Sequence, residues 1–242
     1  MIFILLIVFV LGLILRFPIA FSLGISCLVY LLIKGTPLTV IPLKMYAGID
    51  VFVLLSIPGF ILAGNLMNQG GLTDKIIRFC NHLIGHVRGG LAFVNIGASM
   101  LFAGISGTAI SDTASLGSVL IPAMKKEGYD RDFSCAITAA SSTVGPIIPP
   151  SLPMIIAATL SGLSVGKLFL AGAIPGLLLG AGLFFVAYVV AQRRKYPKNE
   201  KSSFRQRVIS FGETFWALGL TILILFGIIG GVFTPTEASI VA

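Results

Sequence analysis

Two clusters of hydroxyl-bearing residues interrupt apolar segments of this chain, and their chemistry suits ion binding. The first cluster comprises Ser106, Thr108, Ser111, Asp112 and Thr113. The second comprises Ser141, Ser142 and Thr143, beside Gly145-Pro146. A helix break frees backbone carbonyls, and carbonyl and hydroxyl oxygens are the ligands that a hard cation such as Na⁺ requires. The half-helix N-termini at the same breaks carry partial positive charge, which favours an anionic group such as a substrate carboxylate.

Each cluster also has a purely structural interpretation, because Ser, Thr and Gly allow helices to pack closely in lipid. Two clusters, each at a break marked by Gly or Pro, favour a functional role. Asp112 is the only acid inside the first apolar run. It is either a cation ligand or proton carrier, or a first-turn acid that stabilises a helix N-terminus. The scarcity of other intramembrane acids favours sodium coupling over a proton relay.

The composition predicts an all-α polytopic membrane protein. Of 242 residues, 56% are hydrophobic and only 11% charged, against about a quarter charged in soluble domains. The apolar runs are continuous, as in helices, and do not alternate as in barrel strands. The N-terminal run lacks a basic region and a cleavage site, so we expect a retained membrane helix.

The net charge of +8 does not indicate nucleic-acid binding, because much of it lies in one connecting segment. Seven of the 17 Lys and Arg residues fall between Arg193 and Arg207. Such a loop between two apolar spans is expected on the cytoplasmic side, where it could also contact anionic lipid headgroups.

The elements that position the clusters are a hairpin and a broken helix. Residues 89–122 form an apolar run that is interrupted at Ser106-Gly107-Thr108 and flanked by basic residues at both ends. Each arm is shorter than the roughly 20 residues of a spanning helix, so the run is predicted to be a re-entrant hairpin that opens to the cytoplasm. Residues 133–160 contain four prolines, which one continuous helix does not tolerate, and are predicted to form two half-helices around Ser142–Pro150.

The rest of the chain is divided as follows. We expect residues 1–71 to form N-terminal scaffold helices, with one kinked span or two short ones in 1–33, a loop over 34–50 and a kink at Pro58-Gly59. We expect residues 72–88 to form an amphipathic interfacial arm helix, and residues 89–166 to form part of a transport domain. Residues 167–233 would hold two further spans joined by the basic loop 192–210, with the Gly176–Gly180 pair serving packing. A Thr-Pro-x-Glu capping box starts a helix within 234–242. This helix is so short that we expect the chain to be either a fragment or a half-length product whose remainder lies on another chain.

The sequence gives little support to a serine-protease site, a histidine metal site or a cysteine site. Gly104-Ile105-Ser106-Gly107 resembles the nucleophile motif of intramembrane serine proteases, but that chemistry needs a histidine base near the serine. The two histidines, His82 and His86, precede the hairpin on the predicted surface helix, and their spacing alone is insufficient for a metal site. The cysteines at 27, 80 and 135 show neither disulfide nor metal-ligand spacing. No cofactor or metal other than sodium is expected.

Taken together, these motifs resemble the large membrane subunit of TRAP (tripartite ATP-independent periplasmic) transporters, the DctM-like family. The matching sequences are PGFILAG at 58–64, ASMLFAGISGTAISDTASLG at 98–117, TVGPIIPPS at 143–151 and GGVFTPTEA at 230–238. The resemblance implies sodium-driven uptake of organic anions, such as dicarboxylates or sialic-acid-like sugar acids, by an elevator movement in the bacterial inner membrane. It also implies a periplasmic substrate-binding protein and a small four-helix membrane subunit as partners. A two-component anion/sodium symporter without a binding protein remains the alternative.

Carried over to this chain, the resemblance assigns a sodium site and half of a substrate cavity. The expected sodium-binding residues are Ser106, Gly107, Thr108, Thr143, Gly145 and Pro146. The expected cavity residues are Ser106, Thr108, Asp112, Ser142, Thr143, Pro149 and Pro150. Family members have a second, inverted repeat that this sequence does not contain, so we expect the chain alone not to transport.

Overall fold

The computed structural model describes residues 2–199 and 201–241, and the described part of the chain is helical throughout, without a strand. It divides into two compact units, Met1–Val51 and Phe52–Ala242. Two described helices are long and apolar enough to cross a membrane, Phe52–Gln69 and Val165–Arg193. The pair Phe204–Trp216 and Leu218–Ile229, bent by 47°, would make a third if it forms one span.

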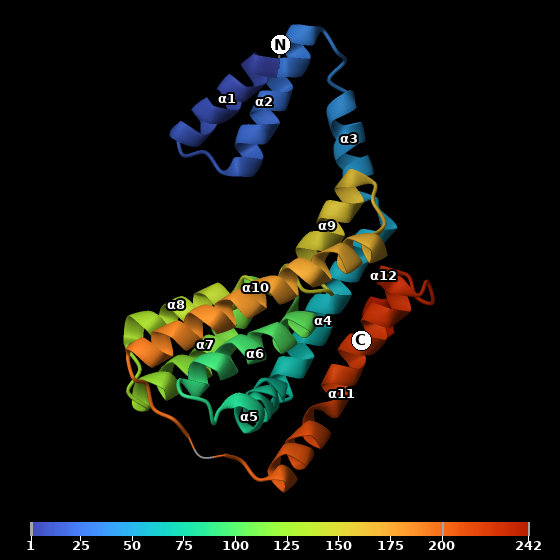
Figure 1. The fold of residues 1–242 in the computed structure, drawn as a ribbon. Helices are drawn as coiled ribbons and strands as arrows, with labels where there is room; N and C mark the ends of the chain where they lie inside the picture. Colours follow the sequence, from blue (N-terminus) through green and yellow to red (C-terminus); the bar gives the residue numbers. More distant parts are fainter. Residues whose placement is uncertain (1, 200, 242) are drawn as a thin grey trace. The chain divides into compact units, whose positions relative to one another are not determined.

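The first unit contains α1 (Ile2–Ile14), α2 (Ile19–Lys34) and α3 (Val40–Ile49). The alternatives for residues 1–33 are therefore resolved in favour of two helices, which lie side by side (Figure 1). They approach closely at Gly12, where a Cβ atom would lie 2.8 Å from Ser22 Oγ. The loop predicted over 34–50 is wrong, because α3 occupies most of it. Pro42 is tolerated there since the first-turn N–H groups of a helix have no intrahelical acceptor.

The second unit begins with a short 3₁₀ turn (Phe52–Leu55) and α4 (Ser56–Gln69). Pro58 thus lies in the first turn of α4 and not at a mid-helix kink. Helix α5 (Leu72–Ile84) follows and buries Ile76, Phe79 and Cys80 against the next two helices. This burial is the amphipathic pattern that the sequence predicts for residues 72–88.

The centre of the second unit is formed by α6 (Gly90–Ser106), α7 (Ala109–Lys126), α8 (Arg131–Ser142) and α10 (Val165–Arg193). Helices α6, α7 and α8 pack on one another, and α10 packs on α6 and α8 (Figure 1). A short helix, α9 (Leu152–Ser161), continues the chain between α8 and α10. A buried cluster that includes Phe60, Ile155 and Phe169 joins α4, α9 and α10.

The last elements are α11 (Phe204–Ile229) and α12 (Pro235–Val241). The loop before α11 is shorter than the predicted 192–210, because the helix starts at Phe204 and the Gln206 side chain accepts a hydrogen bond from the Ser203 N–H. The capping box predicted at α12 is present. The Glu237 carboxylate accepts from the Thr234 N–H at 2.7 Å, and the Glu237 N–H donates to Thr234 Oγ1 at 3.3 Å.

Candidate functional site

The first helix break lies between α6 and α7, where the sequence predicts it. Helix α6 ends at Ser106, and Gly107 takes a left-handed conformation with φ of +61°. Thr108 then caps α7, because its hydroxyl accepts a hydrogen bond from the Ser111 N–H at 3.3 Å. Glycine adopts positive φ without a Cβ clash and threonine is a good N-cap, so Gly107-Thr108 suffices to reverse the chain.

The second break separates α8 from α9. The backbone of residues 143–151 is unwound, and Ser151 starts α9 by accepting a hydrogen bond from the Met154 N–H at 3.3 Å. The same hydroxyl donates to the Pro146 carbonyl at 2.6 Å, which closes the unwound segment on itself. Ser151 is buried and holds this shape. The sequence predicts no role for Ser151, although serine is among the residues preferred at a helix N-cap.

The two breaks are in contact. A Cβ atom on Gly107 would lie 3.1 Å from the Pro150 carbonyl oxygen and 3.2 Å from the Leu152 nitrogen. Phe60 of α4 and Ser106, with Ser151, complete the lining of a small cavity at this junction. The N-terminus of α9 therefore lies against the turn that joins α6 to α7.

Asp112 is the acidic side chain of this junction. Its side chain is fully buried, and the Ser106 hydroxyl donates a hydrogen bond to Oδ1. The other oxygen, Oδ2, is buried without a hydrogen-bond partner among the described residues. It lies against the backbone at Gly145, where a Cβ atom would be 2.6 Å from Oδ2 and 3.2 Å from the Ser142 carbonyl oxygen.

A buried carboxylate oxygen without a donor is costly unless a cation or proton compensates it. The oxygens gathered around it, from Ser106, Asp112 and Ser142, are of the kind that Na⁺ binds. The donor set therefore suits a small hard cation, and Asp112 is hydrogen-bonded to Ser106, one of the predicted sodium residues.

Most of the other predicted residues surround the same junction. Ser142, Pro149 and Pro150 are buried, and Pro146 is half-buried. The Ser142 hydroxyl donates to the Thr138 carbonyl at 2.8 Å, so it points along its own helix.

Thr143 lies apart from the buried group. Its side chain is exposed, and the hydroxyl donates to the Ala140 carbonyl at 2.7 Å. It lines an open surface depression together with Ala109 and Thr113. The predicted residues thus fall into a buried group around Asp112 and an outer position at Thr143.

Glycines of α10 pack directly against the unwound segment. The sequence predicts packing for Gly176 and Gly180, and at Gly176 this packing also positions that segment. A Cβ on Gly176 would lie 2.6 Å from Ile148 Cγ1, and one on Gly172 would lie 2.8 Å from the Ile147 carbonyl oxygen. Gly180 meets Met100 of α6 in the same way. The small-residue face of α10 thus allows the unwound backbone to lie directly on the helix.

A buried polar ladder between α6 and α8 was missed by the sequence analysis. Asn95 Nδ2 donates to Thr138 Oγ1 at 2.7 Å, and Ser99 Oγ lies 2.9 Å from Ser141 Oγ. All four side chains are fully buried. The spacing of Thr138 and Ser141 along one helix face was the available signal. In a low-dielectric interior such satisfied bonds hold two helices in one register.

Ser106 and His82 lie in separate hydrogen-bond networks. The hydrogen-bond partners of Ser106 Oγ are Asp112 and Thr108, whereas His82 contacts Ser202. Within the described residues, no three His, Cys, Asp or Glu side chains gather as metal ligands.

Comparison with known proteins agrees with the resemblance found in the sequence. Residues 6–242 match the family model of the tripartite ATP-independent periplasmic transporter, DctM component. A sialic acid TRAP transporter permease protein of Haemophilus influenzae is 43% identical over 226 residues, which are 93% of this chain and 37% of the relative. The sialic acid large permease protein of Vibrio cholerae is 42% identical, with 93% and 53% covered.

A third relative, the C4-dicarboxylate large permease protein of Rhodobacter capsulatus, is 38% identical over 237 residues, covering 92% of this chain and 54% of the relative. The chain thus spans about half the length of most curated relatives it matches. These relatives are transporter permeases and not enzymes.

Proposed function

Because the chain belongs to the family of DctM components of tripartite ATP-independent periplasmic transporters, we propose that it forms part of a membrane permease for sodium-coupled uptake of organic anions. The observation that carries this proposal is the junction of the two helix breaks. It combines the buried Asp112 carboxylate, one oxygen of which has no hydrogen-bond partner among the described residues, with the contact between the α6–α7 turn at Gly107 and the N-terminus of α9 at Leu152.

The sodium ion would bind on the Asp112 side of the junction. Ser106 and Asp112 would supply side-chain oxygens, and the backbone near Gly145 would supply carbonyls. Sodium binding would neutralise the carboxylate and relieve its unpaired oxygen, so that ion binding and the closed arrangement of the two breaks favour each other. Gly107, Thr108 and Pro146 would shape the site through their backbones, and Thr143 would contribute from the outer side.

The substrate would be a carboxylate-bearing anion. The matched relatives are named for sialic acid and C4-dicarboxylates, and another for 2,3-diketo-L-gulonate. These compounds share an anionic carboxylate, which the N-termini of α7 and α9 would attract. The side chains near this point that would border the substrate are Thr108, Ser142, Pro149 and Pro150.

We also propose a membrane topology and two partner proteins. We propose that α6 and α7 form a re-entrant hairpin in the bacterial inner membrane, and that residues 89–166 belong to a transport domain that moves as an elevator against a scaffold to which residues 1–71 belong. A small four-helix membrane subunit would join the scaffold and a periplasmic binding protein would deliver substrate. The remaining half of the relatives' length would supply a second, related set of breaks.

The direct test is uptake by the complete transporter reconstituted in proteoliposomes, with a sodium gradient and with or without the binding protein. Uptake that requires both sodium and the binding protein is expected. Full uptake of free substrate without the binding protein would favour the two-component symporter. Uptake that is indifferent to sodium would contradict the assignment of Asp112.

A further inference from the structure

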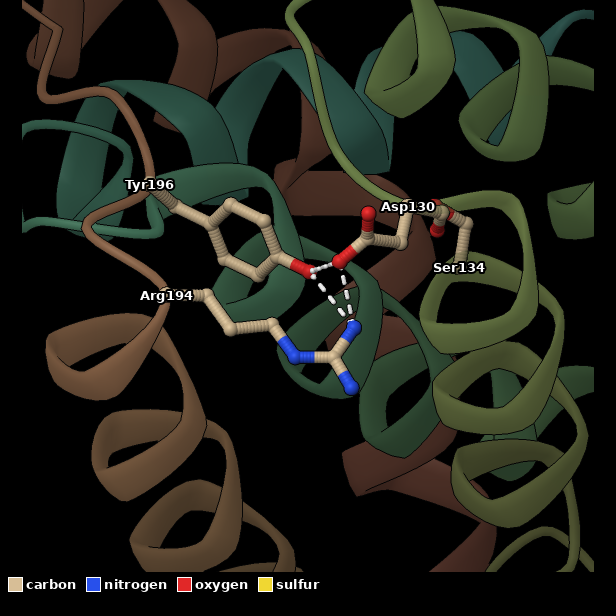
Figure 2. A network of polar contacts seen from close by, with 4 residues as sticks. All are labelled: Asp130, Ser134, Arg194 and Tyr196. Carbon is tan, nitrogen blue, oxygen red and sulfur yellow. Dashed lines mark hydrogen bonds and ion pairs between the residues drawn. The ribbon is translucent and has the colours of Figure 1, made fainter.

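The loop that follows α10 is attached to the end of the helical bundle by a polar network (Figure 2). The Tyr196 hydroxyl donates to Asp130 Oδ2 at 2.7 Å, and the Arg194 guanidinium forms an ion pair with the same oxygen. Asp130 precedes α8, and its carbonyl accepts from Ser134 Oγ at 2.9 Å. We call Tyr129, Asp130, Arg194, Tyr196 and Pro197 the base clamp.

The Tyr196 ring is the anchor of the base clamp. It is only 5% exposed, and its centroid lies 4.3 Å from the Tyr129 ring and 5.4 Å from the Phe133 ring. Burial of an aromatic ring stabilises such a contact much more than an exposed ion pair does. The side chains of Arg194 and Asp130 are 50% and 56% exposed, so the ion pair itself contributes little.

The base clamp also holds the start of the hairpin. The Gly89 N–H donates to the Pro197 carbonyl at 3.0 Å, and the Leu91 N–H donates to the Tyr129 hydroxyl at 3.3 Å. Both donors lie at the N-terminus of α6, where N–H groups lack intrahelical acceptors. Gly89 has φ of +78°, and a Cβ there would lie 2.4 Å from Ala191 Cβ, so the end of α10 touches the base of the hairpin.

From these contacts we propose that the base clamp joins α10 to the hairpin and α8 as one rigid body, and that it stays closed throughout the transport cycle. Tyr196 is then a positioning residue for the site, because it fixes the helix on which residues 147–148 lie. The statement that the base clamp stays closed during the transport cycle rests on the proposed function. The statement that it holds α10, the hairpin and α8 together can be tested without transport.

Limited trypsin digestion of the complete transporter in lipid nanodiscs tests whether the base clamp protects the loop. The bond after Lys195 lies inside the clamp, and the bond after Lys201 serves as an internal reference. Asp130→Ala should raise the cleavage ratio of Lys195 to Lys201 roughly fivefold, because cleavage follows the population of the open loop. Asp132→Ala, an exposed acid on the same turn, is the matched control. Equal ratios in both variants would overturn the clamp.

A covalent lock tests whether the clamp stays closed during transport. The thiols of Asp130→Cys and Arg194→Cys are joined by a reducible cross-linker, in a background in which the exposed cysteines are removed by Cys27→Ala and Cys135→Ala. The locked transporter should retain at least half of the uptake rate measured after reduction. Uptake that stops on locking and returns on reduction would overturn the proposal.

Kinetics distinguish the positioning role from a loss of the site. Asp130→Ala should lower the maximal uptake rate several-fold and leave the half-saturating sodium concentration within about twofold, because no proposed ligand belongs to the clamp. A shift in sodium dependence equal to that of Asp112→Asn would contradict this role. If the unmodified transporter shows no uptake, the proposed function fails while the trypsin ratio still reports on the clamp.

Discussion

The carboxylate of Asp112 lies directly against the backbone of Gly145, although the two residues belong to different helix breaks. A Cβ atom at this position would be 2.6 Å from Asp112 Oδ2, so any larger residue would have to displace the carboxylate or the backbone. This contact connects the hairpin to the unwound segment at Asp112. The contact of Gly107 with Pro150 connects the same two segments at a second point.

Gly145→Ala should therefore disturb the proposed sodium site. The added methyl group must displace the carboxylate or the unwound backbone, and we expect the half-saturating sodium concentration for uptake to rise roughly tenfold. Gly182→Ala in α10 is the control, since a Cβ there meets nothing within 4 Å. The sodium dependence of uptake in proteoliposomes is the measurement, and identical curves for the two variants would contradict the site.

Asp112→Asn keeps the shape of the side chain and removes its charge. If Asp112 balances the charge of a bound sodium ion, the apparent sodium affinity should fall at least about tenfold. Ser106→Ala should weaken sodium dependence less, because it removes one neutral hydroxyl. Thr143→Ala is also predicted to weaken it, and its outer position makes it the mildest of the three. Sodium titration of uptake orders the variants, and an unchanged response in all of them would refute the sodium assignment.

Gly107→Ala should destabilise the protein more than Gly162→Ala. Both glycines have a similar positive φ, +61° and +65°, which costs about 1–2 kcal/mol for alanine. Only at Gly107 would the new Cβ also press on the second break, whereas Gly162 faces open space. Thermal unfolding in detergent should show a clearly lower midpoint for Gly107→Ala. Equal midpoints would mean that the two breaks do not support each other.

The base clamp should be insensitive to pH between about 5 and 9. Hydrogen bonds from Tyr196 and Arg194 lower the pKa of Asp130, so its contribution is present above the ordinary carboxyl pKa of about 4 and is lost only as pH falls further. Burial raises the pKa of Tyr196, and raises that of Tyr129 to about 12. Their contributions are therefore present below about pH 10 and are lost as pH rises beyond it. The trypsin cleavage ratio should stay constant from pH 7 to 9, and a several-fold change in that range would contradict the assignment.

The local features of this protein are determined by its sequence. Gly107-Thr108 ends one helix and starts the next, the prolines of residues 146–153 prevent a continuous helix, and Thr234-Pro235 with Glu237 starts the last one. Each of these features depends on backbone preferences and on hydrogen bonds within a few residues. For the same reason the sequence predicts both helix breaks. Pro42 contributed to the wrong prediction of a loop over residues 34–50, because a proline is compatible with both a loop and a first helical turn.

The relations between distant residues were decided only by the tertiary structure. Nothing in the sequence pairs Asp112 with Gly145, Asn95 with Thr138, or Tyr196 with Asp130, since each contact joins segments separated by many residues. The contacts arise because the glycine face of α10 and the small side chains of α6 and α8 allow close approach of whole helices. Packing of those surfaces also turns the Thr143 side chain outward and Asp112 inward, which periodicity and residue type alone do not specify.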